Sequence, residues 1–259
     1  MLERLAIPAL KGTGNAEDAG LAEALTKRVK ERGDFPLSDG ASVIKAEKSQ
    51  LGLLEQTVKE FKEKPHTPEM VTSYWQTLWQ VWGEKAGLSL TVPLCDRTTE
   101  EISQLEKEGR KLVYVPTEVA SQENRHLLGR IFPEMQSYSV KRDNPVTSES
   151  NQGGWFDIEA NLDSPNRNTK EKDLKNLLKK QGKSGQRLNT FIIASQDAKL
   201  QTSHYFDEET WSRLLGSRHG GHVVGADFGV SGGLGVDWDL GPRRHNSSWG
   251  GRSEGVKKA

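Results

Sequence analysis

The chain has 259 residues, of which 34% are hydrophobic and 28% charged, and its formal net charge at pH 7 is zero. This length suffices for one large domain or two small ones, and the low hydrophobic fraction predicts that part of the chain is exposed loop, tail or polar helix. Zero net charge gives no general attraction to nucleic acids or anionic membranes. The single cysteine, Cys95, excludes an internal disulfide and a paired-cysteine metal site.

The first residues lack the basic start and apolar run of a signal peptide. No stretch approaches the roughly 18 apolar residues of a membrane-spanning helix. We therefore expect a soluble cytoplasmic protein with no membrane partner.

Residues 1–88 predict helices. Leucine and valine recur every four residues in Asp18–Arg32, and a second amphipathic pattern covers Ala41–Lys64. Pro65–Glu69 interrupts the pattern, and there Thr67 suits the N-cap of a new helix with Pro68 at its first position. That helix carries tryptophans on one face, which predict a buried seam, with an aromatic platform for bases or sugars as the alternative: Trp75, Trp79 and Trp82. Two such helices joined by a short turn usually pack antiparallel.

The pattern changes at Leu88, after which strands and helices alternate. The expected elements are a strand over Leu88–Leu94, a helix capped by Thr98 and Glu101 and ending at Gly109, a strand over Lys111–Val115, and a helix over Glu118–Phe132.

Residues 141–153 predict an exposed loop, and four further elements follow it. These are a strand over Gly154–Ala160, a helix from Asn168 or Thr169 to Gln181, a strand or buried helix over Leu188–Ala194, and a β-hairpin over residues 221–240. In the hairpin, Leu234, Val236 and Trp238 alternate with polar residues and should face the core. After Gly241-Pro242 the polar, glycine-rich composition predicts a flexible tail, mostly disordered unless it docks on something.

The fold class that follows is α+β: a helical N-terminal region, then a mixed, partly antiparallel sheet with a C-terminal β-hairpin. The expected segments are a helical region over 1–88, a small strand and helix segment over 89–140, an α+β segment over 151–242, and a basic tail over 243–259.

Two familiar motifs are chance matches. Gly182-Lys183-Ser184 lacks the earlier glycine of a phosphate-binding loop and ends a helix, so Gly182 is better explained as a helix stop. Asp227-Phe228-Gly229 has none of the other protein kinase signatures, and its glycine suits a hairpin turn.

The stretch 204–222 is the strongest candidate for a ligand site. It brings imidazole, carboxylate and guanidinium groups together beside glycine-rich backbone, a composition suited to proton transfer, metal binding or an anionic ligand. We assign no catalytic residue, cofactor or metal ligand there. The candidate ligand-binding residues are His204, Asp207, Arg213, Arg218, His219 and His222.

A basic helix and its exit loop form a second candidate, for neutralising nucleic acid phosphates. The alternative is an exposed face that keeps the helix hydrated. The candidate residues are Lys172, Lys175, Lys179, Lys180, Lys183 and Arg187.

No motif diagnoses a function. Since no catalytic constellation is present, we expect a non-catalytic binding or assembly protein whose partner is an unidentified protein or anionic ligand. The alternatives are a hydrolase or metal-assisted enzyme with its site around His204–His222, and a nucleic-acid-associated protein that uses residues 170–187 and the C-terminal tail.

Overall fold

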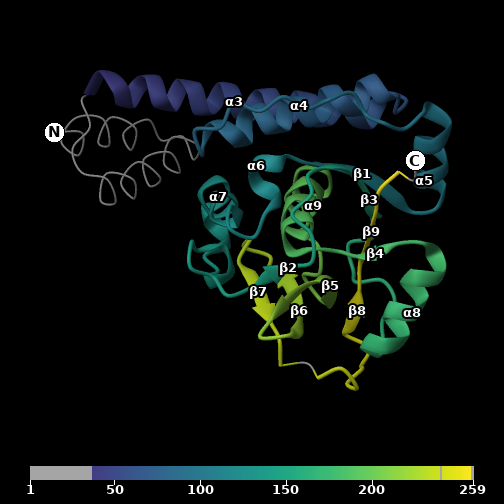
Figure 1. Ribbon diagram of the computed structural model, residues 1–259. Helices are drawn as coiled ribbons and strands as arrows, with labels where there is room; N and C mark the ends of the chain where they lie inside the picture. The colour runs from purple at the N-terminus through teal and green to yellow at the C-terminus, as the bar shows by residue number, and fades with distance from the viewer. Residues whose placement is uncertain (1–36, 240, 258–259) are drawn as a thin grey trace. The chain divides into compact units, whose positions relative to one another are not determined.

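The computed structural model describes residues 37–239 and 241–257, with side chains from Ser49 onward (Figure 1). The chain divides into two compact units, Met1–Gln56 and Thr57–Ala259. Helix α3 (Leu37–Glu63) confirms the helix expected over 41–64, and its last turns belong to the second unit. The helix expected over 18–32 lies outside the described residues, and the finer division into four segments stays a prediction.

Helices precede antiparallel strands in the second unit, which confirms the α+β class. No helix in the described part of the chain is long and apolar enough to cross a membrane. Besides α3, the helices are α4 (Pro68–Glu84), α5 (Thr99–Lys107), α6 (Thr117–Ala120), α7 (Arg125–Ile131), α8 (Glu171–Gln181) and α9 (Leu188–Thr202), with 3-10 turns η1 (Pro133–Met135) and η2 (Tyr138–Val140).

The strands form two sheets. Sheet A has the order β1 (Arg110–Val115), β3 (Gly154–Glu159), β9 (Ser253–Gly255), β4 (Ser184–Gly185), and all its pairs are antiparallel. Sheet B has the order β2 (Thr147–Ser148), β5 (Trp211–His219), β6 (His222–Phe228), β7 (Leu234–Asp237), and β8 (Trp249–Gly251) pairs with β5 in parallel.

Helix α9 contacts both sheets, through β1 of sheet A and β5 of sheet B (Figure 1). All residues from Leu188 to Ala198 are buried, so protein surrounds this part of the helix on every side. Its polar side chains include Asn189 and Asp197, which form hydrogen bonds with other parts of the chain. The sequence left strand and buried helix open for Leu188–Ala194, and the helix is correct.

The tryptophans of α4 cover the edge of sheet A. The indole Nε1 of Trp75 donates to the carbonyl of Leu112 at 3.2 Å, and that of Trp79 donates to Tyr114 at 3.0 Å. Four helical residues rise about 6 Å, and two strand residues rise about 6.6 Å, so the two indoles meet successive outward carbonyls of β1. The predicted buried seam is confirmed, and it also satisfies an edge that would otherwise be open to pairing.

The strand predicted over Leu88–Leu94 is wrong, because α4 takes the hydrogen bonds that a neighbouring strand would need. The Gln76 side chain donates to the carbonyl of Leu90 and accepts from the amide of Val92. The hydroxyl of Thr72 accepts from the amide of Cys95. The segment therefore runs along the helix without joining a sheet.

The single helix predicted over Glu118–Phe132 is also wrong, since α6 and α7 are separate. The buried side-chain amide of Asn189 on α9 donates to the carbonyls of Val119, Ala120 and Ser121. These carbonyls are thereby satisfied without a continuing helix, and the chain turns before α7 begins.

Residues 249–255 of the predicted tail are not flexible but dock on the two sheets, which is the alternative left open for this segment. β8 pairs with β5 in sheet B, and β9 lies between β3 and β4 in sheet A. Between the two strands, the fully buried Arg252 donates through Nε and Nη2 to Asp207. Glu254 pairs with the buried Arg187 at 2.5 Å, and its pKa is raised because burial outweighs that pairing.

The β6–β7 hairpin is confirmed, with Phe228 opposite Leu234 and Ala226 opposite Val236. Its predicted inward face is only partly correct, because Leu234 is buried while Val236 and Trp238 are half-buried. Trp238 instead stacks on His219, with ring centroids 3.9 Å apart.

Replacing Trp75 or Trp79 with phenylalanine should destabilise the protein by about 1–3 kcal/mol more than the same change at Trp82, because it leaves a buried carbonyl without a donor. Trp82 is equally buried, and within the described residues its indole has no hydrogen-bond partner. Urea unfolding of the three variants measures the difference. Equal losses would show that packing alone holds α4 on β1.

Arg252→Met and Asp207→Leu should each cost about 3–5 kcal/mol, because each leaves one buried charge unpaired. The double variant should cost clearly less than the sum, since neither charge remains. Arg243→Met, at an exposed arginine of the same segment, is the control and should be near neutral. A double-mutant cycle in urea tests this, and additive losses would contradict a direct coupling.

Candidate ligand pocket

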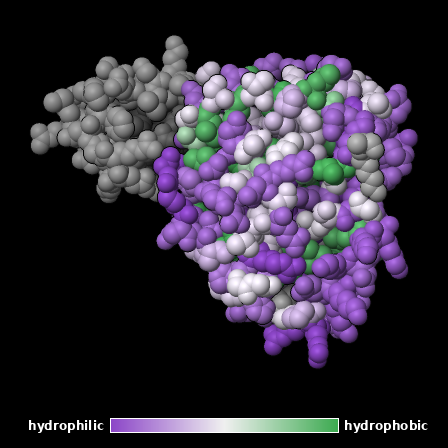
Figure 2. Space-filling model, viewed as in Figure 1, coloured by the Kyte–Doolittle hydropathy of each residue, from purple (hydrophilic) through white to green (hydrophobic). Residues whose placement is uncertain are grey.

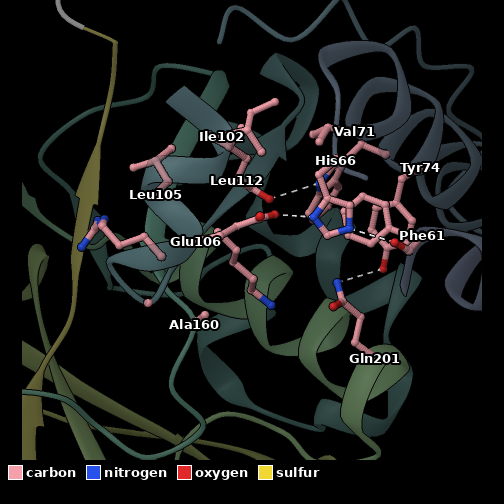
Figure 3. Close-up of a pocket in the computed structure, with 14 residues that line it drawn as sticks. Phe61, His66, Val71, Tyr74, Ile102, Leu105, Glu106, Leu112, Ala160 and Gln201 are labelled. Carbon is pink, nitrogen blue, oxygen red and sulfur yellow. Dashed lines mark hydrogen bonds and ion pairs between the residues drawn. The ribbon is translucent and has the colours of Figure 1, made fainter. Parts of the chain in front are cut away.

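An apolar pocket of about 290 Å³ lies within the second unit, among α4, α5, the start of β1 and the last turns of α3 (Figure 3). Its size is at the lower limit for a small-molecule site. Most of its wall is hydrocarbon or aromatic ring. The lining residues include Phe61, His66, Tyr74, Leu105, Glu106, Lys111 and Gln201.

Three stacked rings form one side of the pocket. Phe61 lies between His66 and Tyr74, with ring centroids 4.0 Å from each (Figure 3). The imidazole Nδ1 of His66 bonds the carboxylate of Glu106, and its Nε2 bonds the carbonyl of Phe61 at 2.8 Å. Both partners are acceptors, so a ring protonated at both nitrogens can donate to both and a neutral ring to only one.

A buried carboxylate network lies behind the stacked rings. Asp197 of α9 accepts from the hydroxyl of Tyr74 at 2.5 Å, from Lys111 Nζ at 2.8 Å and from the Gln201 side chain at 2.9 Å. Burial, the charge of Asp197 and its hydrogen bond together raise the pKa of Tyr74 well above its usual value. The Tyr74 hydroxyl is therefore a hydrogen-bond donor that keeps its proton at neutral pH.

The polar groups of the pocket retain some unused hydrogen-bonding capacity. Lys111 has three N–H groups, and Asp197 accepts from it; the side-chain carbonyl of Gln201 accepts no hydrogen bond from the described residues. Since Asp197 neutralises Lys111, this part of the pocket suits an uncharged polar group better than a second carboxylate.

The three histidines of the predicted 204–222 site make separate contacts. His204 is exposed and bonds Glu208 at 2.9 Å, while His219 stacks on Trp238. His222 is exposed and faces His219 across the two-glycine turn between β5 and β6. Within the described residues no hydrogen bond or ring stacking joins one histidine side chain to another, and no group of three or more His, Cys, Asp or Glu residues is placed to hold a metal ion.

The other three predicted ligand residues are largely taken up by the protein itself. Asp207 is fully buried in its ion pair with Arg252. Arg213 is buried and donates to the backbone carbonyls of Thr169 and Arg244, so it holds two loops together. Arg218 is partly exposed and pairs with Glu149 at 3.1 Å. A ligand role for these residues stays a prediction.

The basic stretch forms a helix, as predicted, but not all of its predicted cations are exposed. Lys172, Lys175, Lys179 and Lys180 are exposed on α8. Lys183, by contrast, pairs with Asp157 at 2.5 Å. Arg187 is buried in its pair with Glu254, so it adds no exposed charge to this surface, and its phosphate-binding role stays a prediction.

Neighbouring charges change the ionisation of two carboxyl groups in opposite directions. Burial alone would raise the pKa of Asp157, but the hydrogen bond from Lys183 and the charges of Arg110 and Lys183 lower it. No described residue places such a cation beside Asp227 on β6, and burial and the negative charge of Asp207 raise its pKa to about 6.

Sequence reasoning did not identify the pocket. His66 and Glu106 are 40 residues apart, and Tyr74 and Asp197 are 123 apart, so no local spacing connects them. Leu105 looks like an ordinary apolar-face position of a short helix, and Gln201 looks like an ordinary exposed helix position. The one available signal was the aromatic face of α4, which was interpreted correctly as core.

Comparisons with protein family models, with curated proteins and with solved structures found no match to this chain. A functional proposal therefore depends on the geometry of the pocket and of the surface alone.

Asp227→Asn should stabilise the protein relative to the wild type, increasingly as the pH rises from about 4 to 7. The folded pKa of about 6 lies above the ordinary value of 3.8, so the folded state holds a proton that the unfolded state has lost, and stability falls across this window. Urea unfolding at several pH values measures the difference. Asp239→Asn, at an exposed position, should show no such trend; a constant difference for Asp227→Asn would contradict the assignment.

Proposed function

We propose that this protein is a non-catalytic binding protein whose pocket takes a small, uncharged molecule with an apolar body and one polar group. The observation that carries the proposal is the pocket itself: an apolar wall with few polar groups, each already oriented by a partner. Pockets of this composition bind ligands by burying apolar surface, and the polar groups determine orientation.

The state of the ionisable groups favours binding over catalysis. A general acid or base has to exchange its proton near neutral pH. The Tyr74 proton is held by Asp197, and Lys111 is paired with the same carboxylate. The His66–Glu106 pair is bonded to the carbonyl of Phe61 rather than directed at an open position. An enzyme centred on His204–His222 has less support, because the side chain of His204 is bonded to Glu208 and that of His219 is stacked on Trp238, rather than on another histidine.

The uncharged nature of the ligand follows from the charges around it. Lys111 and Asp197 neutralise each other, and Glu106 at the rim is a carboxylate. A second carboxylate would lose its hydration without gaining an unpaired cation. A hydroxyl or amide can accept from Lys111 and donate to the Gln201 carbonyl without that cost.

Ligand-detected NMR with phenol, benzamide and benzoate tests the proposal. Phenol and benzamide should bind with Kd on the order of 0.1–1 mM, as expected for ligands of this size, and benzoate at least tenfold more weakly. Leu105→Trp, which fills the pocket, should abolish binding. Leu94→Trp makes the same change at an exposed leucine outside the pocket and should leave binding unchanged.

Two outcomes would overturn the proposal. Binding that survives Leu105→Trp would place the ligands elsewhere. If the wild type binds no probe at millimolar concentration, the pocket is a packing defect. Circular dichroism of both variants shows that they are folded, so that a loss of binding in Leu105→Trp reports on the pocket.

A further inference from the structure

Helix α8 exposes a row of lysines on the side opposite its core contacts. Leu174 and Leu178 are buried in a cluster with Leu215 and Val223. The spacing of Lys172, Lys175 and Lys179 by three and four residues places them on one helical face, and Lys180 follows directly. Among the described residues, none of the four lysines forms an ion pair or a side-chain hydrogen bond.

The loop 241–248 adds two arginines beside the start of this helix. The amide of Glu171 donates to the carbonyl of Pro242 at 3.2 Å, and Arg213 donates to the carbonyl of Arg244. These contacts hold the loop, while the side chains of Arg243 and Arg244 are exposed. The cations of helix and loop thus outnumber the two acidic residues of the helix, Glu171 and Asp173.

This basic surface suits a polyanion in water better than a membrane. A helix that lies on a bilayer inserts an exposed apolar face. The apolar residues of α8 are instead turned toward the core, and none of the exposed large hydrophobic residues in the described part of the chain belongs to α8. Figure 2 shows the region of α8, at the lower right, as largely hydrophilic.

The row also has a suitable length for a phosphate backbone. Lys172 to Lys179 spans about 10 Å at 1.5 Å per residue, which corresponds to roughly three phosphates along one strand of a duplex. Flexible lysines contact phosphates as point charges and do not read base edges.

We infer that the exposed face of α8, with Arg243 and Arg244, binds the sugar-phosphate backbone of nucleic acid without sequence preference. This surface excludes Lys183, Arg187 and Arg252, which the sequence alone would include, because their charges are paired inside the protein. The inference does not depend on the pocket.

The test compares the full chain with the variant Lys172→Glu/Lys175→Glu/Lys179→Glu. Fluorescence anisotropy with a labelled 20-nucleotide single-stranded RNA, the matching DNA strand and its duplex is measured between 50 and 200 mM NaCl. The wild type should bind all three and weaken steeply with salt. The variant should bind at least tenfold more weakly, and its slope of log K against log salt should be shallower by about 2 to 3, since roughly three phosphate contacts are lost.

The matched control is Lys85→Glu/Lys107→Glu/Lys141→Glu, which makes the same change of net charge at three exposed lysines elsewhere. It should stay within about twofold of the wild type. Two milder variants cover the case in which charge reversal disturbs folding. Each should lose an intermediate amount of affinity for the oligonucleotides: Lys172→Gln/Lys175→Gln/Lys179→Gln and Arg243→Gln/Arg244→Gln.

Three results would overturn the inference. Equal weakening in the control would show a general effect of net charge, and no binding by the wild type at 50 mM NaCl would exclude a nucleic acid surface. Binding to vesicles with one-third phosphatidylserine, together with no binding to the oligonucleotides, would assign the face to a membrane.

Discussion

The ion pair between Arg252 and Asp207 is the interaction on which the two sheets depend. Arg252 is the residue between β8 and β9, and therefore lies where the chain passes from sheet B to sheet A. A guanidinium without exposure needs a carboxylate and further acceptors; Asp207 and the carbonyl of Leu162 accept from Nε and Nη2, while Nη1 has no partner among the described residues. The ion pair therefore ties the C-terminal strands to the segment before β5.

The meeting of the sheets imposes a second constraint, on side-chain size. A Cβ at Gly185 of β4 would overlap the side chain of Leu215, and one at Gly216 of β5 would lie 2.9 Å from the Cγ of Arg187. The two backbones approach closely only because both positions are glycine. Arg187 follows β4 and begins α9, and the pairing of β4 with β9 brings it to Glu254, so that a second buried ion pair joins sheet A to the start of α9.

The pocket is a consequence of how α4 is fixed on sheet A. The indoles of Trp75 and Trp79 align α4 with β1. Tyr74, which directly precedes Trp75, is thereby placed within hydrogen-bonding distance of Asp197 on α9. The His66 turn is joined to α5 through Glu106. Helix, strand and turn leave between them a space that the side chains of the wall do not fill. No residue of α8 lines the pocket, so the apolar pocket and the basic surface on α8 are two separate and chemically different features.

The sequence by itself determined the local elements whose signals lie within a few residues. The Thr67 cap, the capping box of Thr98 and Glu101, Gly182 as the end of α8 and the β6–β7 hairpin are all present, because each depends on neighbouring residues alone. The α+β class and the buried tryptophan face followed from periodicity in the same way.

Tertiary structure alone decided what remote side chains do. Gln76 forms hydrogen bonds with the backbone of residues 88–94, 14 residues away at Leu90, and so prevents a strand there. Asn189 donates to the carbonyl of Val119, 70 residues away, and so divides a predicted helix. In the sequence, Arg187 and Arg252 look like parts of a basic surface, and Arg213 looks like a ligand-binding residue. All three are buried in the fold, since a charge pattern does not say which cations find acceptors inside. For the same reason the His66–Glu106 and Tyr74–Asp197 pairs of the pocket have no sequence signal. Hydrogen bonds and ion pairs across tens of residues are set by packing, whereas caps, turns and amphipathic faces are set by adjacent residues.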